Sequence, residues 1–587
     1  MKKTPLISII MPVYNPEFSD LNKAILSCIN QTYQSWELCI CDDCSTKPYV
    51  KPLIKKFISK DKRIKAVFSE KNEHISAASN KVLSLAKGDY IGFLDHDDEL
   101  DKKALEEIAK SIKENNPDMI YTDEAVLNKN NLKEPIFKPD FSPENLMSCN
   151  YIVHFVVVKK EIIKKIKGFE IGTEGAQDYD LVLKISEITK NIIHISKILY
   201  YWRKSKHSIL NNINNKPYVI NAGKKVLEHA LKRRKIQGDV EITKNFGIYK
   251  VNYKIINNPK VSIIVSFKDK ANITKNCIES ILKKTAYINY EIILIDNNSN
   301  KQTLKYLGKI KNKKIKILHY NNYFNFSKIN NFASKFAKGE YLLFLNNDIK
   351  ILSRDWLEEM LSICQQKEIG IVGAKMIFPN GKIQHAGISY DSKKGFYQSY
   401  YKFNGKDKGY SGHNMIYRRN CISVLGACLM IKKDIFNSIN GFDENLAVEK
   451  NDVDICLRIW KKGFQVVFTP FTKILHYESS SRKGLDISKD NNYFSKKYKE
   501  LKDPFTNENI TLDEDFIKKS SPYCIKRKIY SIPYYCYKEH GIKYTLKKCR
   551  DFILNPKKIT ELYQRTLIFY LFVPLIDREK HTIWVSY

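Results

Sequence analysis

The sequence predicts an α/β protein with two tandem domains, each built on a mostly parallel, Rossmann-like sheet, and a short C-terminal extension. Short apolar runs alternate with helical patterns in each half of the chain, as in parallel sheets with crossover helices. Polar residues follow several of these runs directly, and open α/β sheets bind ligands beyond the carboxyl ends of their strands. Three motifs of the first half also recur in the second half in the same order.

The repeated motifs keep a nearly constant spacing. The matching positions are Ser8 and Ser262, Asp42 and Asp296, and Asp97 and Asp348. These pairs are separated by 254, 254 and 251 residues. A period of about 250 residues is too long for a solenoid repeat and fits two copies of one domain. We therefore expect domains at residues 1–240 and 241–520, linked through residues 239–260, and an extension at residues 521–587.

The first half is predicted to contain four strands separated by helices. Apolar runs between turn signals predict strands at residues 7–13, 37–41, 64–68 and 90–94. Apolar residues at helical spacing predict helices at residues 19–31, 51–59 and 77–86, and another that begins near Lys102. Polar groups follow three of the strands, at Tyr14-Asn15, Asp42-Asp43 and Asp95-His96-Asp97. An aromatic ring, a carboxylate that can pair with a base, and metal-binding carboxylates would together suit a nucleotide diphosphate.

The acidic stretch after the fourth strand has two interpretations. Asp95, Asp97 and Asp98 stand close together, and carboxylates in this arrangement repel one another unless a cation lies among them. Carboxylate oxygens suit Mg²⁺ or Mn²⁺, which often also bind phosphate oxygens, so the stretch predicts a metal–diphosphate site. The alternative is an acidic turn into the next helix, with Asp98 or Asp101 as its N-cap. The second copy, which keeps Asp348, favours the metal site.

The composition describes a globular and strongly basic chain. Its 587 residues suffice for two or three domains with full cores, and 43% of them are hydrophobic. The net charge of +35 allows nucleic acid, an anionic membrane surface or phosphorylated substrates as partners. The sequence lacks helix-turn-helix, zinc-finger and RNP-like patterns, so nucleic acid is not expected as a partner. No segment reaches the ~20 apolar residues expected of a membrane-spanning helix.

Both halves also carry longer motifs. Those of the first half include His74-Ile-Ser-Ala-Ala-Ser-Asn80, Leu94-Asp-His-Asp-Asp98 and Gly175-Ala-Gln-Asp-Tyr-Asp180. Those of the second half include Phe344-Leu-Asn-Asn-Asp348, Ile383-Gln-His-Ala-Gly387 and Asn451-Asp-Val-Asp454. Across residues 5–516 the chain resembles glycosyltransferase family 2, which has the GT-A fold. Its tandem arrangement is similar to that of enzymes of bacterial O-antigen and capsule assembly.

The resemblance implies an inverting transfer of a sugar from a nucleotide-sugar donor. Asp97 and Asp348 match the metal-binding Asp of the family, where Mg²⁺ or Mn²⁺ would neutralise the diphosphate leaving group. His476 matches a family His that can also bind the metal, although a lone His before Tyr is otherwise often structural. Asp178 and Asp452 match the catalytic Asp that takes the proton of the acceptor hydroxyl. Each precedes a helical pattern, so a plain N-cap is the alternative for both.

The resemblance also implies donor-binding positions. They are Pro12, Tyr14, Asn15, Asp43 and Asp95 in the first half, and Lys268, Asp269, Asp296 and Asn297 in the second. Three of the second-half positions differ in residue type from their counterparts, so the two halves are expected to differ in nucleotide preference. The position before Trp202, which is often His in the family, is Tyr201 here. A His ligand is therefore not expected at that position of the first half.

We expect an enzyme that builds a cell-surface glycan with an active site in each domain. Its expected partners are a UDP-, dTDP- or GDP-sugar and a lipid-linked or oligosaccharide acceptor. The alternative is one catalytic domain beside a second domain that only holds the growing glycan. The basic surface predicts a cytoplasmic protein that binds peripherally to the inner face of the plasma membrane. The extension, with apolar residues such as Leu567 and Phe569, would either lie on that membrane or cover the second domain.

Overall fold

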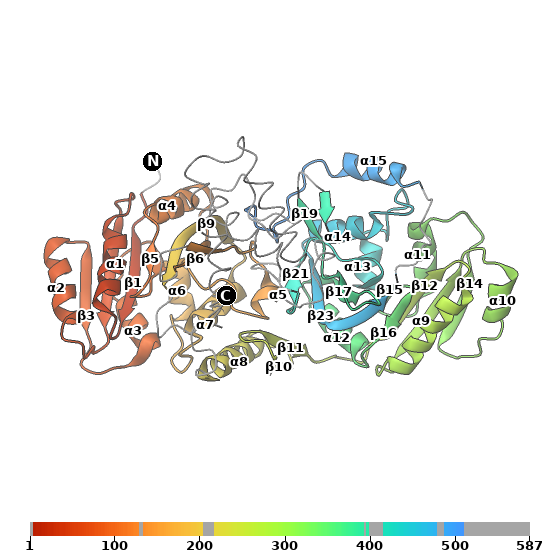
Figure 1. The fold of residues 1–587 in the computed structure, drawn as a ribbon, viewed down its shortest axis with the longest axis horizontal. Helices are drawn as coiled ribbons and strands as arrows, with labels where there is room; N and C mark the ends of the chain where they lie inside the picture. The colour runs from red at the N-terminus through yellow and green to blue at the C-terminus, as the bar shows by residue number, and fades with distance from the viewer. Residues whose placement is uncertain are drawn as a thin grey trace, which may run out of the picture. The chain divides into compact units, whose positions relative to one another are not determined.

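The computed structural model describes residues 4–127, 133–203, 217–391, 395–397, 415–477 and 486–509. Its main elements form two large sheets with helices packed against them, one among the red to yellow elements of Figure 1 and one among the green to blue elements. The predicted extension at residues 521–587 lies outside the described residues. Within the described part of the chain, no helix is both long enough and apolar enough to cross a bilayer.

The first nine strands form one sheet. They are β1 (Ile7–Val13), β2 (Trp36–Asp42), β3 (Ile64–Phe68), β4 (Tyr90–Phe93), β5 (Glu99–Leu100), β6 (Met119–Leu127), β7 (Lys133–Ile136), β8 (Val156–Lys159) and β9 (Ile192–Arg203). The helices are α1 (Phe18–Ile29), α2 (Val50–Lys60), α3 (His74–Leu83), α4 (Ala104–Asn115), α5 (Pro143–Leu146), α6 (Lys160–Ile166), α7 (Gln177–Ile188) and α8 (Pro217–Arg233). Strands β1 to β4 are parallel to one another, as predicted, and the rest of the sheet is mixed.

The second large sheet is built from residues 261–476. Its strands are β12 (Val261–Phe267), β13 (Tyr290–Asp296), β14 (Ile315–His319), β15 (Tyr341–Asn346), β16 (Ile349–Ile351), β17 (Ile369–Ile377), β18 (Ile383–His385), β21 (Arg419–Asn420), β22 (Cys428–Lys432) and β23 (Gln465–His476). Strands β19 (Ser389–Asp391) and β20 (Gly395–Tyr397) pair separately. The helices are α9 (Ala271–Lys284), α10 (Lys301–Leu307), α11 (Phe326–Ser334), α12 (Trp356–Cys364), α13 (Lys433–Ser438), α14 (Asn451–Lys461) and α15 (Ser488–Lys497).

The two large sheets share one topology. The first runs in the order β3-β2-β1-β4-β8-β6-β9-β5, and the second runs β14-β13-β12-β15-β22-β17-β23-β16. Each strand in the order of the first sheet thus has a counterpart at the same place in the order of the second sheet. The central strands β1 and β12 are buried almost throughout, because helices cover both faces of a parallel sheet. The predicted duplication of an α/β domain is therefore confirmed.

A matching polar contact ties three segments together in each domain. The hydroxyl of Ser8 donates to Glu37 at 2.5 Å and accepts the backbone N–H of Gly88 at 2.8 Å. In the second domain the hydroxyl of Ser262 accepts the backbone N–H of Gly339 at 2.8 Å. The same hydroxyl donates at 2.6 Å to the carboxylate of Glu291, which is the counterpart of Glu37. A Cβ at either glycine would lie within 2.7 Å of the serine hydroxyl. The repeated glycine is thus required by close packing in both copies.

The structure corrects three local predictions. Helix α3 begins at His74, three residues before the predicted start at residue 77. The N-cap of α4 is Lys103, so the proposal that Asp98 or Asp101 caps this helix is wrong. The predicted link at residues 239–260 contains a two-stranded hairpin, formed by β10 (Gly238–Ile242) and β11 (Tyr249–Tyr253).

Candidate active sites

A cavity of about 460 Å³ lies at the carboxyl ends of β1 and β4 in the first domain. Asp95, Asp97 and Asp178, which the sequence predicts as site residues, all line it, and so does Pro12. The other polar or aromatic residues in its wall include Ser79, Asn150, His154, Gln177 and Trp202. The fold therefore brings the predicted metal-binding and base positions into one pocket.

Asp178 lies in the first turn of α7 and faces this cavity. The N-cap residues are Ala176 for α7 and Lys450 for α14, so the N-cap alternative is wrong for both helices. The carboxylate accepts a 2.8 Å hydrogen bond from the amide of Asn150. Burial raises the pKa of Asp178, while the nearby His154 and the Asn150 amide lower it in part. A partly buried carboxylate with a raised pKa is suited to accept a proton from a bound hydroxyl.

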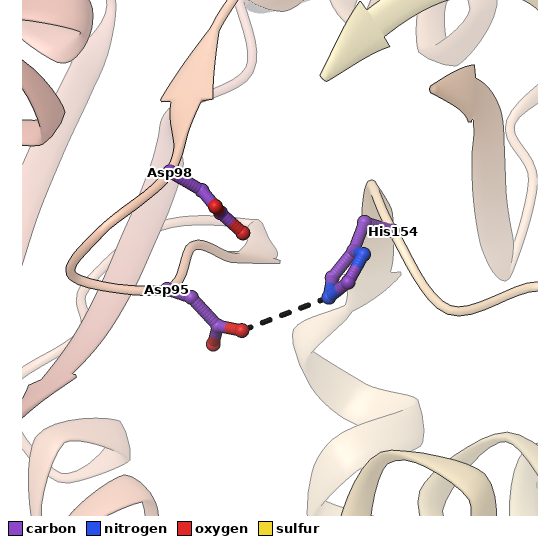
Figure 2. Close-up of side chains that lie close together, drawn as sticks. All are labelled: Asp95, Asp98 and His154. Carbon is purple, nitrogen blue, oxygen red and sulfur yellow. Dashed lines mark ion pairs between the residues drawn. The ribbon is translucent and has the colours of Figure 1, made fainter. Parts of the chain in front are cut away.

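Asp95 and Asp98 lie on one loop and approach the ring of His154, as Figure 2 shows. Ligand atoms of the three side chains all lie within 4.8 Å of one another. Asp98 is buried, and its carboxylate accepts hydrogen bonds from the hydroxyl of Tyr200 at 2.6 Å and the backbone N–H of Arg203 at 2.7 Å. Asp98 therefore braces the loop against β9, whereas Asp95 lines the cavity.

His154 is a site residue that the sequence analysis missed. Its Nε2 lies 3.6 Å from a carboxylate oxygen of Asp95, and its Nδ1 lies 3.2 Å from one of Glu124. Glu124 in turn lies 3.3 Å from the Nζ of Lys138, and both of these side chains are buried. Burial opposes the charge on His154, but the two carboxylates outweigh it and raise its pKa well above the usual range. The two carboxylates thus favour the protonated form of the imidazole beside Asp95.

The first site also fits a divalent cation. Burial and the charges of Asp95 and Asp20 raise the pKa of Asp97, which means that the ionised carboxylate is disfavoured in the protein alone. Asp97 lines the same cavity as Asp95, and a cation bound at Asp97 would remove this penalty. Oxygen ligands of this kind suit Mg²⁺ or Mn²⁺, and donor phosphates can complete the coordination.

Asn15 and Asp269, two predicted donor-binding residues, make equivalent contacts. The backbone N–H of Asn15 donates to the hydroxyl of Ser45 at 3.0 Å, and that of Asp269 donates to the hydroxyl of Ser299 at 2.7 Å. The side-chain oxygen of Asn15 accepts the backbone N–H of Thr46 at 2.8 Å. The side-chain oxygen of Asp269 accepts the backbone N–H of Asn300 at 2.6 Å. Both residues have a positive φ, 48° and 54°, which Asn and Asp tolerate better than most residues. They fix the loop that follows the second strand of each sheet.

Asp43 and Asn297 are buried at matching strand ends but are bonded differently. The carboxylate of Asp43 accepts the backbone N–H of Glu73 at 3.0 and 3.1 Å. The amide nitrogen of Asn297 donates to the carbonyls of Tyr320 and Asn322, at 3.0 and 2.8 Å. Its amide oxygen is buried without a hydrogen-bond partner among the described residues. The expected difference in nucleotide preference stays a prediction.

The remaining donor-binding predictions fall at the same edge. Tyr14 follows β1 with 45% of its surface exposed, and Lys268 is exposed at the matching position after β12. Asp296 is buried at the end of β13, where its carboxylate lies 3.1 Å from the Nδ1 of His319 and accepts the N–H of Ser299 at 3.1 Å. Asp296 therefore supports the loop, while the exposed side chains are the ones open to a ligand.

His476 and Asp348, the predicted metal ligands of the second domain, face each other. The Nε2 of His476 lies 3.2 Å from a carboxylate oxygen of Asp348. The Nδ1 lies 2.7 Å from the amide oxygen of Gln384 on β18. An amide oxygen only accepts, so Nδ1 carries a proton and Nε2 is the ring nitrogen that faces Asp348. The geometry places Nε2 and the Asp348 carboxylate within reach of one metal ion.

Asp452 lies in the first turn of α14 and reaches the same strand ends. Its carboxylate accepts the backbone N–H of Gly426 at 2.9 Å. A Cβ on Gly426 would lie 3.1 Å from that of Asp452, so glycine permits this approach. Gly426 stands just before β22, which pairs with β15 so that Cys428 lies opposite Leu345. The pairing carries Asp452 to the strand end that bears Asp348.

The sheet registers show that the counterpart of His476 is Trp202 and not Tyr201. Strands β16 and β23 pair with Ile349 opposite His476. Strands β5 and β9 pair with Glu99 opposite Tyr201. Ile349 directly follows Asp348, the predicted metal-binding residue of the second domain. Glu99 instead follows Asp97, the predicted metal-binding residue of the first domain, by two residues. The antiparallel ladder therefore puts Trp202 at the position that His476 holds in the second domain.

Each of the two matching α/β domains carries acidic side chains at the carboxyl edge of its sheet, as in the GT-A class of transferases. Residues 8–154 and 262–426 match the family described as Glycosyl transferase family 2. The chain belongs to glycosyltransferase family 2.

Several curated proteins resemble the chain. Uncharacterized protein y4gI of Sinorhizobium fredii is 35% identical over 554 residues, which cover 90% of this chain and 60% of that protein. O-antigen biosynthesis protein RfbC of Myxococcus xanthus is 34% identical over 490 residues, 82% of this chain and 38% of that protein. The Escherichia coli protein named UDP-Glc:alpha-D-GlcNAc-diphosphoundecaprenol beta-1,3-glucosyltransferase WfgD is 30% identical over 210 residues, 35% of this chain and 80% of that protein. The chain thus spans less than two thirds of the length of the first two relatives.

Proposed function

We propose that both domains are inverting glycosyltransferases, each of which moves a sugar from a nucleotide-sugar donor to a hydroxyl of a growing glycan. The observation that best supports this is the cavity of the first domain, lined by Asp97 and Asp178, because it gathers cation-binding and proton-accepting groups around one centre. Asp178 takes the proton of the acceptor hydroxyl as the oxygen bonds to the anomeric carbon. The bond from that carbon to the diphosphate breaks on the opposite face, so the configuration inverts.

Each domain would hold its own divalent cation, Mg²⁺ or Mn²⁺. Asp95 and Asp97 would hold it in the first domain, and Asp348 and His476 in the second. When bound, the cation supplies positive charge that stabilises the departing diphosphate. Asp452 is the base of the second domain, where the backbone N–H of Gly426 fixes one of its oxygens.

The donors are nucleotide sugars with a UDP, dTDP or GDP leaving group. They would lie along the loops shaped by Asn15 and Asp43 in the first domain, and by Asp269 and Asn297 in the second. The side chains of Tyr14 and Lys268 stand exposed above these loops and would touch the nucleotide. The different bonding of Asp43 and Asn297 supports a different nucleotide or sugar for each domain.

The acceptor is a lipid-linked or oligosaccharide glycan intermediate. The names of RfbC and WfgD support this, since the first refers to O-antigen biosynthesis and the second to a diphosphoundecaprenol-linked sugar. A lipid-linked acceptor lies at a membrane, and the net charge of +35 would draw the protein to an anionic surface. Sedimentation with anionic vesicles at low salt, with partial release at high salt, is the expected behaviour. A protein that stays in the supernatant at low salt would contradict the membrane part of this proposal.

Substitution of the two bases tests the function. Asp178→Asn and Asp452→Asn each remove one carboxylate while they keep the side-chain size. With a mixture of candidate donors and an acceptor oligosaccharide, each variant should stop at a different partial product, which mass spectrometry distinguishes. If one substitution stops all transfer and the other has no effect, only one domain is catalytic and the other serves as a glycan-binding module.

A further inference from the structure

A second aspartate follows each proposed base by two residues. Asp180 and Asp454 are completely buried, on α7 and α14 respectively. Each is paired with a basic residue one turn later on its own helix, Lys184 at 2.8 Å and Arg458 at 2.7 Å. Residues two apart on a helix point about 200° away from each other. The base therefore faces the reaction centre, and the second aspartate anchors the other side of the same helical turn.

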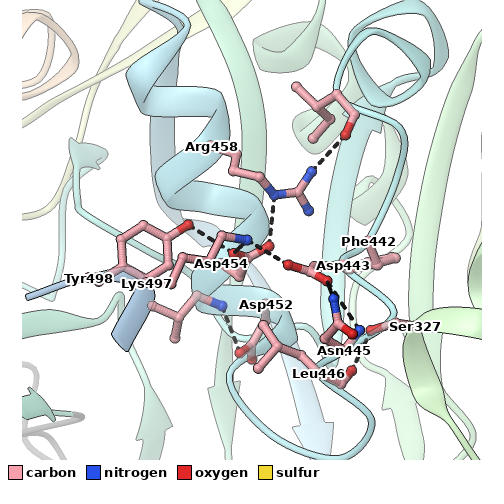
Figure 3. A network of polar contacts seen from close by, with 12 residues as sticks. Ser327, Phe442, Asp443, Asn445, Leu446, Asp452, Asp454, Arg458, Lys497 and Tyr498 are labelled. Carbon is pink, nitrogen blue, oxygen red and sulfur yellow. Dashed lines mark hydrogen bonds and ion pairs between the residues drawn. The ribbon is translucent and has the colours of Figure 1, made fainter. Parts of the chain in front are cut away.

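Each buried aspartate is also held by a helix that follows the last long strand of its sheet. In the first domain, Arg233 of α8 approaches Asp180 at 3.1 Å. In the second domain, Lys497 of α15 approaches Asp454 at 2.7 Å, and the hydroxyl of Tyr498 donates to the same carboxylate at 2.8 Å. Figure 3 shows these groups converging on Asp454 from α14 and α15. Two domains of different sequence thus use the same arrangement.

The same two helices also hold the loop before each base. The Nζ of Lys225 on α8 donates to the carbonyl of Gly172 at 2.8 Å. On α15, the buried carboxylate of Asp490 accepts the backbone N–H groups of Val448 and Glu449, at 2.7 and 2.8 Å. Helices α8 and α15 are therefore fastened both to the segment that leads into the base helix and to its first turn.

These contacts bear on the position of the base carboxylate. A buried carboxylate that loses one of its two paired cations keeps less compensation for its charge, so the first turn would shift toward the remaining partner or toward water. The proposed base stands in that same turn, and a displacement of about 1 Å at a reacting group costs about 100-fold in rate. The pair Lys497–Asp454 is thus placed to act on Asp452 without touching a substrate.

We propose that Asp180 and Asp454 are positioning residues of sugar transfer, and that α8 and α15 act through them to set the base carboxylates Asp178 and Asp452. This inference rests on the proposed function. It assigns a catalytic purpose to two helices that lie outside the segments matched by the family, which end at residues 154 and 426.

The test uses the full-length protein and Lys497, because 28% of its side chain is exposed and its loss should be compatible with folding. Lys497→Met should lower kcat of the second-domain step by about 10- to 100-fold and leave the KM for its donor and the first-domain step unchanged. Lys497→Arg should restore most of the rate. Lys496→Met, on an exposed neighbour in the same helix, is the matched control and should behave like the unmodified protein.

The corresponding variant in the first domain is Arg233→Met, which should slow only the first-domain step. Its matched control is Lys232→Met, at the exposed neighbouring residue. The proposal is wrong if Lys497→Met leaves kcat unchanged, or if it slows both steps equally together with a lower melting temperature. Asp452→Asn separates this outcome from a failure of the proposed function. If Asp452→Asn stops the second step and Lys497→Met does not slow it, the base assignment stands and only the positioning role fails.

Discussion

The Nε2 of His476 lies 3.2 Å from Asp348 in the second domain, and the strand position that corresponds to His476 in the first domain is a tryptophan. The first domain supplies its imidazole from another segment, as His154, which lies 3.6 Å from Asp95. The partners behind the two rings also differ, because a neutral amide holds His476 and a carboxylate holds His154. The ring in the second domain is therefore held by a neutral group, and the ring in the first domain by a charged one.

Removal of the amide behind His476 should weaken metal binding in the second domain only. Gln384→Leu leaves the ring without its partner at Nδ1, and loss of such a partner typically costs 10- to 100-fold in metal affinity. The Mn²⁺ concentration needed for half-maximal rate of the second-domain step should rise by about that factor. The first-domain step, measured in the same sample, is the control. An equal rise in both steps would show that His476 does not hold the metal.

Removing one charge of the buried pair Glu124–Lys138 should destabilise the protein more than removing both charges. Glu124→Gln leaves Lys138 buried without its carboxylate and should destabilise the first domain by about 3–5 kcal/mol. The double variant Glu124→Gln with Lys138→Met removes both charges and should regain part of that loss. Denaturant unfolding of the unmodified protein, the single variants Glu124→Gln and Lys138→Met, and the double variant measures the coupling. Additive effects would mean that the two charges do not stabilise each other.

The glycines that touch Ser8 and Ser262 should not tolerate a side chain. A Cβ at Gly88 or Gly339 would lie 2.6 to 2.7 Å from backbone and hydroxyl atoms, so alanine should cost about 1–3 kcal/mol at either position. Gly308→Ala is the control, because the nearest atoms there lie 3.7 Å away and its φ of −63° suits any residue. Thermal unfolding should show large shifts for the first two variants and a small one for the third. Three similar shifts would contradict the close packing.

The ion pair between Asp443 and Lys497 should make part of the stability of the second domain acid-sensitive. Burial alone would raise the pKa of Asp443, but Lys497 and hydrogen bonds from Asn445 and Tyr493 lower it to about 2. Because the folded pKa lies below the unfolded value of about 3.9, the contribution is fully present above pH ~4 and is lost as the pH falls toward 2. Asp443→Asn should destabilise the protein at pH 7, by about 1 kcal/mol, and progressively less below pH 4. A difference that does not change with pH would exclude this linkage.

Much of the fold could be predicted because hydrophobic periodicity and the duplicated motifs are local signals. The strands at residues 7–13 and 64–68 have the predicted bounds, and the parallel order of the first four strands follows from the alternation with helices. The co-location of Asp97 and Asp178 in one cavity could be anticipated only from the resemblance to a family. Spacing in the sequence does not reveal which strand ends meet.

The residues that the sequence analysis missed are those whose role depends on pairing between distant segments. Glu124, Lys138 and His154 come from β6, the segment after β7 and the loop before β8, and each looks ordinary in its local context. The resemblance to the family points to Tyr201, the residue before Trp202, as the counterpart of His476, whereas the ladder register places that counterpart at Trp202. A one-residue difference in register turns a side chain to the other face of the sheet.

Two active sites that work independently should complement each other when the two base variants are mixed. Asp178→Asn retains the second site, and Asp452→Asn retains the first. Incubated together with both donors and an acceptor oligosaccharide that can dissociate between steps, the two variants should form the complete product that neither forms alone. Mass spectrometry of the products should then show the full addition in the mixture and distinct partial products in the separate reactions. Failure of the mixture to extend the acceptor beyond what one variant achieves by itself would contradict two independent sites.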